Sequence, residues 1–442
     1  MKKFSKDFLL GAATSAHQVE GNNIYSDYWA MEQMKNSQFV EPSGKAVDHY
    51  NKYEEDIKML SDAGLNAYRF SIEWARIEPQ KGIFDEKEIQ HYKDVIDCCK
   101  KYNVEPIITL HHFTSPKWLI EMGGWENEEV VELFANYTKY VVENIKDEVN
   151  YICTINEANM RLQVKSLMER FMKQMMAKTG GNTPNISNVE QNDNSNDMEG
   201  QLQVGLNLSN PMEKMKLTAI ENMQVFGDMN PHTFVSAAGE TGDEIVINAH
   251  KAAKNVIKSI NPKINVGITL SLHDIQCVEG GEEKAKKNWD EEFGHYVEYI
   301  KDDDFFGLQN YTRTVYDKDG IVPVENGIPM TQMDYEIYPE ALEHVIRRVN
   351  KEMPNVPIIV TENGIAVDDD NIRCNFIDKA INGIQSCQQD GINILGYCYW
   401  SLLDNFEWQK GFALTFGLCE VNRSTYERTP KNSLTHLGKY AG

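Results

Sequence analysis

Short apolar runs alternate along the chain with longer segments in which apolar positions recur every three or four residues. The short runs fall at residues 8–18, 67–74, 106–113, 151–158, 264–272, 304–312, 357–364 and 392–404. A short apolar run bounded by turn residues is typical of a strand buried on both faces. Eight such strands separated by helices predict an α/β fold of the (β/α)8 barrel type, although a doubly wound sheet shows the same alternation.

The longer segments carry the pattern of helices that bury one face. One of them places apolar side chains at Val130, Phe134, Tyr137, Val141 and Ile145. Spacings of three and four residues put all five on a single helical stripe. We therefore expect helices between the strands, packed on the outside of a barrel that forms a single domain over residues 1–442.

The alternation is interrupted between the fourth and fifth predicted strands, where about a hundred residues replace one crossover. Ten of the 18 methionines lie between Met160 and Met229. The centre, "TGGNTPNISNVEQNDNSNDMEG", is polar and predicts a loop, and its flanks predict Met-rich helices. We expect an insertion over residues 160–243. Because methionine usually fills gaps in a core, the energetics favour helices that pack on themselves; the alternative is a lid that covers the barrel mouth and a flat apolar leaving group.

The net charge of the chain limits the classes of molecule that it can bind. The chain has 44 basic and 67 acidic residues, a formal charge of −23. Such a chain repels nucleic-acid phosphates, so we expect no nucleic-acid partner, and a strongly anionic substrate is disfavoured. No apolar run approaches the length of a membrane span, so no membrane partner is expected. The sequence leaves a homo-oligomer open.

Cysteine usage and the amino-terminal segment bear on the compartment. The eight cysteines include no CxxC pair, which indicates reduced thiols and a cytoplasmic location. The opening "MKKFSKDFLLGAATSA" has features of a secretory signal. However, Asp7 interrupts it and the apolar run from Phe8 to Ala13 is short, so we interpret it as the first strand.

Polar and aromatic residues at the carboxyl ends of the predicted strands are the candidates for chemistry, since those ends line the active site of an α/β barrel. They are His17, Gln18, Glu20, Arg69, His111, His112, Asn156, Glu157, Gln309, Asn310, Tyr311, Glu362, Glu407 and Trp408. Amides and carboxylates bind hydroxyl groups, and aromatic faces cover the C–H surfaces of sugars. With neither metal-ligand spacing nor a phosphate-binding loop, we expect no cofactor and no metal. Adjacent His111 and His112 point to opposite faces of a strand and rarely share an ion.

Glu157 and Glu362 end two buried apolar runs. A buried carboxylate is costly unless it is paired with a cation or used in chemistry, and both interpretations are open for Glu362. Two carboxylates facing one sugar indicate glycoside hydrolysis. A separation of ~5 Å gives retention of configuration, whereas about 6.5–9.5 Å leaves room for water and gives inversion. The sequence leaves that distance open.

The ordered motifs resemble those of glycoside hydrolase family 1, the retaining β-glucosidases and β-galactosidases. "FLLGAATSAHQVEG", "YRFSIEWARIEP" and "HHFTSPKWLIEMGGW" are similar to the first three strands of that family. "TINEA" resembles its TxNEP motif, "VTENG" its [IV]TENG motif, and "WSLLDNFEWQKGF" followed by "ERTPKNS" its C-terminal signature. The resemblance covers the whole chain except the fourth crossover, and the order of the motifs makes it specific.

The resemblance implies a role for each matching position. Glu362 corresponds to the nucleophile and Glu157 to the acid/base, with Arg69 and Tyr311 beside Glu362. A cation and a hydroxyl donor should lower the pKa of Glu362, whereas an apolar site and the Glu362 charge should raise that of Glu157. The sugar-binding positions correspond to Gln18, His112, Asn156, Gln309, Trp400, Glu407 and Trp408.

Three positions bear on specificity. Phospho-sugar members carry a smaller residue at the position of Glu407, so the resemblance implies unphosphorylated substrates here. "LQNYT" stands where the family usually has "NYYT", which lengthens a sugar-site amide at Gln309 and leaves the role of Asn310 open. Ala158 replaces the usual proline.

The sequence thus predicts a retaining exo-β-glycosidase whose small-molecule substrates are β-D-glucosides, with β-D-galactosides and β-D-fucosides as further candidates. Alternatives are the same fold with another glycone or with transglycosylase activity, a non-catalytic sugar-binding barrel, and a metal-dependent barrel hydrolase.

Overall fold

The computed structural model describes residues 2–178, 203–207 and 212–442, with side chains left undescribed at 171–178 and 212–213. Its main sheet contains nine parallel strands in the order β5-β4-β3-β2-β1-β11-β10-β8-β6. These are β1 Leu9–Ala13, β2 Ala67–Ser71, β3 Glu105–His111, β4 Tyr151–Ile155, β5 Asn265–Gly267, β6 Thr269–Ser271, β8 Phe306–Gln309, β10 Ile358–Asn363 and β11 Ile394–Trp400. Only Ile268 separates β5 from β6, so they are two halves of one strand and the sheet closes on itself. The predicted (β/α)8 barrel is confirmed.

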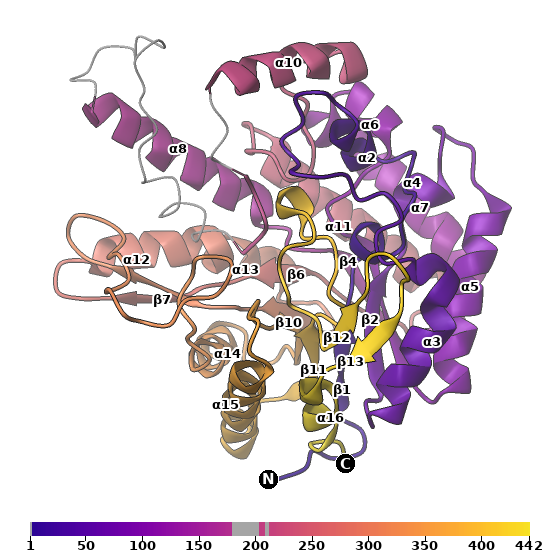
Figure 1. Cartoon of the computed structure of the whole chain (residues 1–442), viewed down its shortest axis with the longest axis vertical. Helices are drawn as coiled ribbons and strands as arrows, with labels where there is room; N and C mark the ends of the chain where they lie inside the picture. The colour runs from indigo at the N-terminus through magenta and orange to yellow at the C-terminus, as the bar shows by residue number, and fades with distance from the viewer. Residues whose placement is uncertain (1, 179–202, 208–211) are drawn as a thin grey trace.

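Helices surround the barrel, as Figure 1 shows. The main covering helices are α3 His49–Asp62, α5 Glu86–Lys101, α7 Glu129–Ile145, α11 Gly242–Ile260, α12 Glu282–Trp289, α13 His295–Ile300, α14 Ala341–Glu352, α15 Asp370–Gln389 and α16 Asn432–Gly438. The stripe predicted on α7 is buried at each of its five positions. The apolar faces of these helices contribute to the core outside the sheet or pack on neighbouring helices and on the small sheet of β7 Asp274–Cys277 and β9 Arg313–Tyr316, and the opposite faces remain polar.

Each strand contributes to two apolar layers because side chains alternate between its faces. In β2, Ala67 belongs to the cluster inside the barrel, whereas Tyr68 and Phe70 belong to the larger cluster between sheet and helices. The inward series also contains Arg69, which is completely buried. A buried cation is costly unless it is paired, so Arg69 requires an anionic partner inside the barrel.

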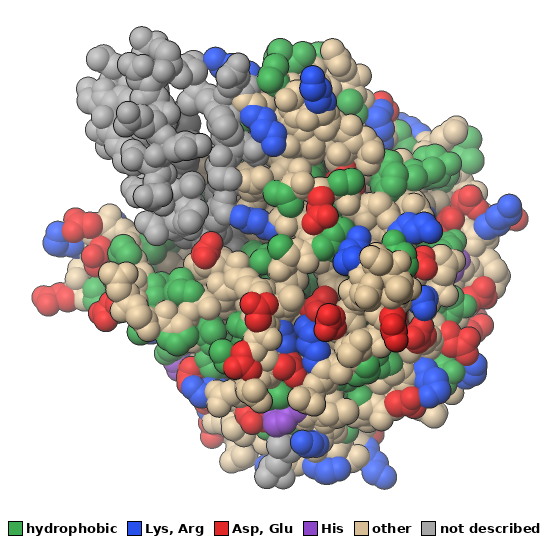
Figure 2. Space-filling model, viewed as in Figure 1, with side chains coloured by type: hydrophobic (Ala, Val, Ile, Leu, Met, Phe, Trp, Pro, Cys, Tyr) green, Lys and Arg blue, Asp and Glu red, His purple; other side chains and the backbone are tan. Residues whose placement is uncertain are grey.

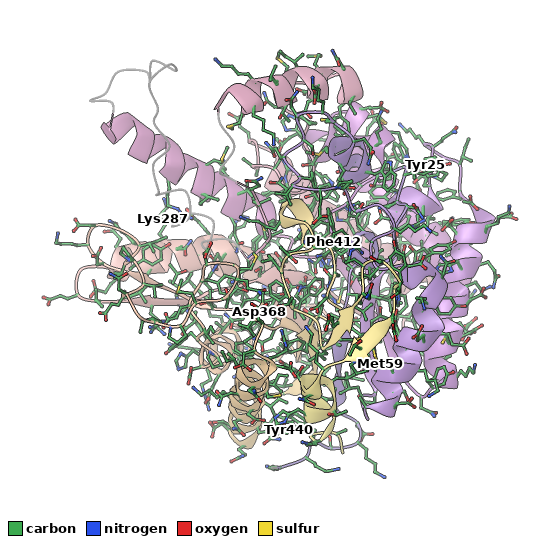
Figure 3. All side chains as sticks on the ribbon, in the orientation of Figure 1. Tyr25, Met59, Lys287, Asp368, Phe412 and Tyr440 are labelled. Atoms are coloured by element: carbon green, nitrogen blue, oxygen red, sulfur yellow. The ribbon has the colours of Figure 1, made fainter. Side chains whose placement is uncertain are left out.

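The active end of the barrel is built from short elements that follow the strands. They include α1 Ala16–Val19, α2 Asp27–Glu32, α4 Trp74–Ile77, α6 Lys117–Glu121, η1 Gly124–Glu126 and η4 Trp408–Lys410. In Figure 1 this end faces the helices α8 and α10, and both chain termini lie at the other end. Figure 3 shows the same polarity: Phe412, from the loop after β11, lies toward the mouth, and Tyr440 lies near the amino ends of the strands.

The insertion adds two helices at the mouth, α8 Met160–Lys178 and α10 Met212–Phe226, which confirms the predicted helical flanks. The predicted loop at residues 179–200 lies outside the described residues. Helix α8 packs against α11 and the π-helix η3 Asp290–Gly294, and α10 packs against α6. Thr218 and Glu221 of α10 also bind Asn36, on a loop of the barrel mouth. Within the described residues, these helices therefore pack on the barrel.

Two small sheets complete the fold. Strand β7 Asp274–Cys277 pairs in parallel with β9 Arg313–Tyr316, and β12 Cys419–Val421 pairs with β13 Arg428–Pro430. On the face shown in Figure 2, acidic and basic side chains are interspersed, and an apolar area at the top lies over α10. Its exposed apolar residues are Met215, Leu217, Ile220 and Met223. No described helix combines the length and apolar character needed to cross a membrane.

Candidate active site

Glu362 is aimed into the barrel by a β-bulge. In β10, Val360 pairs with Leu308 and Glu362 pairs with Gln309, so Thr361 is an extra residue on this strand. Ile359 belongs to the inner cluster and Val360 to the outer one. Strict alternation would therefore turn Glu362 toward the helices. The bulge shifts the alternation by one residue and places the carboxylate inside the barrel, as bulges beside active sites do.

Arg69 and Tyr311 bind the Glu362 carboxylate from opposite sides. Arg69 Nη1 donates to Oε1 at 2.5 Å, and the Tyr311 hydroxyl donates to Oε2 at 2.6 Å. All three side chains are buried. The charge of the buried Arg69 guanidinium is therefore balanced by the Glu362 carboxylate. The two hydrogen bonds hold that carboxylate in one orientation.

The pKa of Glu362 departs from the prediction. Burial raises it above the ordinary value, and the opposing effects of Arg69 and Tyr311 reduce the rise without reversing it. The sequence identified the two groups that favour the charged form. It does not show how far the loss of water opposes them, and the Glu362 side chain is only 2% exposed.

Glu157 lies in surroundings that favour its neutral form. Its backbone has a positive φ of 45°, an uncommon conformation for a residue with a side chain, and its N–H donates to Thr269 Oγ1 at 2.9 Å. Among the described residues, nothing hydrogen-bonds its Oε2, which is buried. Burial, followed by the negative charge of Glu362, raises the pKa of Glu157 well above its ordinary value. The predicted direction of the Glu157 pKa shift is confirmed.

Asn156 is bound both to Arg69, which holds the Glu362 carboxylate, and to Thr269, which binds the Glu157 backbone. Its Oδ1 accepts from Arg69 Nη2 at 2.6 Å, from Gln309 Nε2 at 2.8 Å and from Thr269 Oγ1 at 3.3 Å. Three donors to Oδ1 fix the orientation of the Asn156 amide, so Nδ2 points away from those donors. That Nδ2 is buried and has no partner in the described part of the chain, so it is available to donate to a ligand.

The amides at Gln309 and Asn310, whose roles the sequence left open, serve different purposes. Gln309 uses Nε2 to hold Asn156 and Thr269, and its buried Oε1 has no partner within the described residues. Asn310 Nδ2 donates to the backbone oxygens of Leu272 and Thr312. Gln309 therefore belongs to the site, whereas Asn310 binds the backbone of the strand ends.

Gln18 and Glu407 are hydrogen-bonded to each other and form a second wall of the site. Gln18 Nε2 donates to Glu407 Oε2 at 3.2 Å and to the backbone oxygen of Phe406 at 2.8 Å. The backbone N–H of Gly205 donates to Glu407 Oε1 at 3.1 Å. Burial raises the pKa of Glu407 to about 8. At neutral pH this carboxyl group is therefore mostly protonated, and it can both donate to and accept from a hydroxyl group.

Aromatic rings border the same wall. The His112 ring stacks on Trp400 with centroids 5.7 Å apart and on Trp408 at 6.1 Å. Burial and the nearby Arg69 charge lower the pKa of His112 well below its ordinary value, so the ring is neutral. His111 points the other way, as expected: its Nε2 contacts Ser115, and its ring packs on Trp125 and Phe234.

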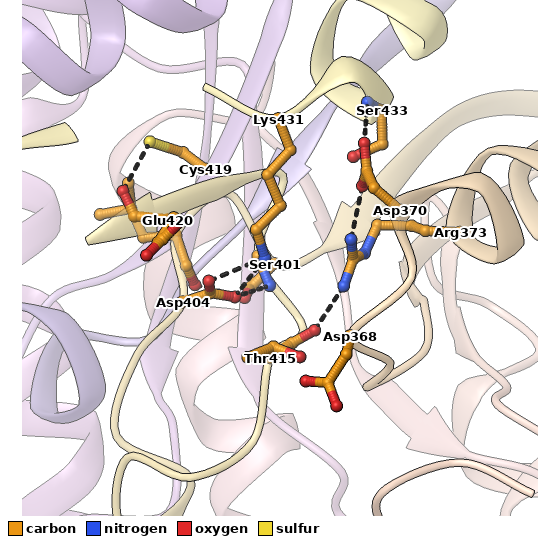
Figure 4. A network of polar contacts seen from close by, with 12 residues as sticks. Asp368, Asp370, Arg373, Ser401, Asp404, Thr415, Cys419, Glu420, Lys431 and Ser433 are labelled. Atoms are coloured by element: carbon orange, nitrogen blue, oxygen red, sulfur yellow. Dashed lines mark hydrogen bonds and ion pairs between the residues drawn. The ribbon is translucent and has the colours of Figure 1, made fainter. Parts of the chain in front are cut away.

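A polar network holds the loop that carries Glu407 and Trp408 (Figure 4). Lys431 binds Asp404 at the start of this loop, and Asp404 accepts from the Gly417 N–H at its end. Arg373, on α15, donates to the Thr415 backbone oxygen at 2.6 Å and to Asp370 at 2.5 Å. The loop is thus bound at several points to the barrel and to its outer helices, which fixes Glu407 relative to Glu362.

Three residues of the site were missed by sequence reasoning. Thr269 binds both Asn156 and the Glu157 backbone, and alternation along its strand was the signal that could have identified it. Tyr335 is buried; burial, and then the carboxyl group of Glu407, Tyr399 and the carboxyl group of Glu157, raise its pKa well above its usual value, so its hydroxyl group interacts electrostatically with the site. Gly205 acts through its backbone, and no residue type marks such a role. Within the described ranges, no cluster of His, Cys, Asp and Glu has the geometry to hold a metal ion.

Comparison with known proteins agrees with this geometry. The family model described as "Glycosyl hydrolase family 1" matches residues 1–440. The solved β-glycosidase BGL167 is 40% identical, with a TM-score of 0.84 over 99% of this chain and 97% of that one. The 1,4-beta-D-glucan glucohydrolase of Thermotoga neapolitana is 29% identical over 98% of this chain and 97% of the relative. The 6-phospho-beta-galactosidase of Clostridium acetobutylicum is 28% identical over 98% and 96%. A match over nearly the whole length, on a closed barrel with two buried carboxyl groups at its mouth, shows that the chain belongs to glycosyl hydrolase family 1.

Proposed function

We propose that the chain is a retaining exo-β-glucosidase that uses Glu362 as nucleophile and Glu157 as acid/base. The observation that carries this proposal is the contrast between two buried carboxyl groups in one site. Glu362 is held by a cation and a hydroxyl group, which favour its anion, whereas Glu157 has neither. Opposite surroundings give opposite protonation states, which is what double displacement requires.

In the first step the Glu362 carboxylate attacks the anomeric carbon while Glu157 gives its proton to the glycosidic oxygen. The bond between that carbon and oxygen breaks, the aglycone leaves as an alcohol, and the sugar remains as an ester of Glu362. In the second step Glu157, now a carboxylate, takes a proton from water, and the water oxygen attacks the anomeric carbon. Glu362 is released, and the sugar has the configuration with which it began.

The change of role at Glu157 follows from electrostatics. The charge of Glu362 is one of the causes that raise the pKa of Glu157. Glycosylation removes that charge and so lowers the pKa of Glu157, which makes its carboxylate form accessible when a base is needed. The same residue therefore works as an acid in one step and as a base in the next.

The sugar is held from two sides. Asn156 Nδ2, which is buried and has no partner among the described residues, would donate to the 2-hydroxyl, a bond that strengthens in the transition state. Gln18 and Glu407 would bind the 4- and 6-hydroxyls, and Trp400 with His112 would cover the C–H face. The neutral Glu407 carboxyl group suits hydroxyls because it can donate as well as accept.

We further propose that the substrates are unphosphorylated. The groups that contact the Glu407 carboxylate, the Gln18 amide and the Gly205 backbone, are uncharged. A phosphate dianion buried there would face a carboxyl group and gain no cation from these contacts. A panel of 4-nitrophenyl β-glycosides tests this: glucoside hydrolysis is expected, and 6-phosphoglucoside hydrolysis is expected to be absent. The galactoside and fucoside determine how strictly the glycone is selected, and faster cleavage of the 6-phosphoglucoside would contradict the proposal.

The insertion over residues 160–243 is proposed to act as a lid at the mouth. Its residues Gln203–Asn207, which we call the strap, support this. Besides the Gly205 bond to Glu407, the Gln409 N–H donates to the Gly205 oxygen at 3.0 Å, and the Asn207 N–H donates to Gln409 Oε1 at 2.8 Å. A part of the insertion thus contacts the loop that carries the sugar-binding residues.

Gly205→Ala is expected to weaken substrate binding without unfolding the barrel. A Cβ at this position would lie 2.6 Å from the Glu407 backbone oxygen and 3.0 Å from its Cγ, so the strap must move away from Glu407. We expect KM for a nitrophenyl glucoside to rise about tenfold, the effect of losing a hydrogen bond to a sugar-binding carboxyl group, with a smaller change in kcat. Steady-state kinetics measure this, with thermal unfolding as the control. An unchanged KM would show that the strap does not position Glu407.

A cytoplasmic location is also proposed. All eight cysteines are free thiols, as expected for a protein kept in a reducing compartment. Fractionation of cells that produce the chain tests the compartment, and sedimentation tests whether it forms homo-oligomers.

A further inference from the structure

Three of the proposed sugar-binding residues are neighbours in sequence of three rings that pack together. The neighbouring pairs are His17–Gln18, His112–Phe113 and Glu407–Trp408. The Trp408 ring stacks on the His17 ring, with centroids 5.9 Å apart and an angle of 6° between the planes, and the Phe113 ring lies 5.2 Å from that of Trp408. We call the buried rings of His17, Phe113 and Trp408 the ring cluster. A shift of this cluster would therefore act on the sugar-binding residues beside it.

Two members of the ring cluster have a strained backbone. Phe113 has a φ of 70° and Trp408 a φ of 46°, a left-handed conformation that is unfavourable for bulky residues. Such a conformation persists only where the surrounding structure holds it, and it recurs in active sites. Packing of the Trp408 ring against His17 and Phe113 supplies that restraint. If the ring were released, the Trp408 backbone could relax, and Glu407, the preceding residue, would move with it.

His17 is the member of the ring cluster that hydrogen bonds hold in place. The residue lies on α1, and its side chain is buried. Its Nε2 contacts Glu32 Oε1 at 2.8 Å, and its Nδ1 contacts Asn23 Nδ2 at 3.1 Å. Because both ring nitrogens have partners, rotation of the ring is restricted. The hydrogen bonds thus set the plane on which the Trp408 ring stacks.

The partner of His17 is itself fixed. Glu32, on α2, accepts at its other carboxylate oxygen from the Ser43 N–H at 2.9 Å and from Ser43 Oγ at 2.6 Å. Ser43 belongs to the loop between α2 and α3, and in this loop the Val40 N–H donates to the Gln409 backbone oxygen at 3.1 Å. Gln409 directly follows Trp408. The carboxylate of Glu32 therefore joins the His17 ring to a loop that also holds the chain just after Trp408.

The buried pair of His17 and Glu32 is explained by orientation better than by stability. Replacing a buried ion pair by apolar side chains of similar volume is often neutral for stability, because the loss of water offsets the attraction between the charges. Apolar side chains at these positions could fill the same space. They could not fix the rotation of a ring, which requires directional hydrogen bonds.

We propose that His17, held by Glu32, is a positioning residue for glycone binding: it fixes Trp408 and thereby places Glu407 and Gln18 at the 4- and 6-hydroxyls of the sugar. This inference rests on the proposed glucosidase function. Gln18 follows His17 in the chain and donates to Glu407 at 3.2 Å, so both groups of this wall depend on the same ring. His17 acts through these neighbours and touches no reacting atom.

The test compares kcat/KM on 4-nitrophenyl β-glucoside and on 4-nitrophenyl β-xyloside, which lacks the hydroxymethyl group that carries the 6-hydroxyl. His17→Leu removes the ring and both hydrogen bonds. We expect the ratio of kcat/KM on the glucoside to that on the xyloside to fall about tenfold, chiefly through KM for the glucoside. His17→Phe keeps a ring of similar volume and loses only the hydrogen bonds, and its ratio is expected to fall about threefold.

His49→Leu is the matched control. His49, on α3, is also buried and pairs with Asp56 at the same distance of 2.8 Å, but its ring contacts Tyr68 on the outer face of β2. The substitution is expected to lower Tm and to leave the ratio of the two substrates as it is in the unmodified chain.

A merely structural role of His17 would lower activity on the glucoside and the xyloside alike. The inference is overturned if the ratio is unchanged in the His17 variants, or if it falls equally in His49→Leu. If His17→Leu does not fold, His17→Phe decides by the same ratio. Failure of the unmodified chain to hydrolyse either substrate is a different result, and it would overturn the proposed function itself.

Discussion

Glu362→Gln is expected to lower kcat on 4-nitrophenyl β-glucoside by about 10⁵-fold, because an amide cannot form the glycosyl-enzyme and only binding and transition-state positioning remain. The measurement is single-turnover and steady-state kinetics on the purified variant. The variant must be shown to be free of unmodified enzyme, since a trace of it would set the apparent residual rate.

The same substitution is expected to reduce stability. Arg69 would keep its hydrogen-bond acceptor at position 362 but would lose the charge that balances its own, and breaking a buried ion pair costs about 3 kcal/mol or more. Circular dichroism should show a folded barrel with a lower Tm. The matched variant Asp56→Asn breaks another buried pair, which joins α3 to Arg428 outside the barrel. We expect Asp56→Asn to lose stability and retain turnover. If Glu362→Gln turned over normally, Glu362 would not be the nucleophile.

Glu157→Ala is expected to separate substrates by their leaving groups. Proton donation contributes about 10²–10⁴-fold when the leaving oxygen is basic and little when it leaves readily as an anion. Cleavage of an alkyl glucoside should therefore fall by about 10³-fold, whereas formation of the glycosyl-enzyme from a dinitrophenyl glucoside should change little. Rates across a series of aryl and alkyl glucosides measure this, and equal losses across the series would exclude the acid role.

The pH dependence of activity in Glu157→Ala tests the acid role of Glu157 independently. A raised pKa at Glu157 means that its acid form persists above the ordinary range, and activity falls as the pH rises through that pKa. A raised pKa at Glu362 means that the nucleophile is protonated, and activity falls, as the pH drops through a value above the ordinary one. In Glu157→Ala the alkaline fall should disappear and the acid fall should remain. An unchanged alkaline limb would assign it to another group.

The strands and the polar residues that end them could be predicted because both depend on local pattern, whereas the roles of those residues were implied by the family resemblance. Each predicted strand was a short apolar run. A strand that is buried on both faces has apolar residues at successive positions, so it can be recognised in the sequence without knowledge of its neighbours. Arg69, Asn156, Gln309, Tyr311 and Glu362 were expected near one another because the carboxyl ends of parallel strands meet at one end of a barrel. The structure joins these five residues in one hydrogen-bonded network.

What the sequence could not predict depends on exact register and on contacts between distant segments. The bulge at Thr361 leaves no mark in residue type, yet it decides which way Glu362 points. Gly205 reaches Glu407 across 202 positions of the chain through its backbone. The direction of the Glu362 pKa shift needed the balance between burial and pairing, and residue identities give only the pairing. The role of Gln309 could not be predicted either, because only the structure shows that its Nε2 donates to Asn156.

The anomeric configuration of the first sugar released shows whether Glu362 forms a covalent bond to the sugar. Proton NMR of a β-glucoside digest, recorded before mutarotation, distinguishes the two anomers. Attack by Glu362 followed by attack of water inverts the anomeric carbon twice, so β-glucose is expected as the first product. If α-glucose appears first, water attacks the substrate directly and Glu362 forms no bond to the sugar.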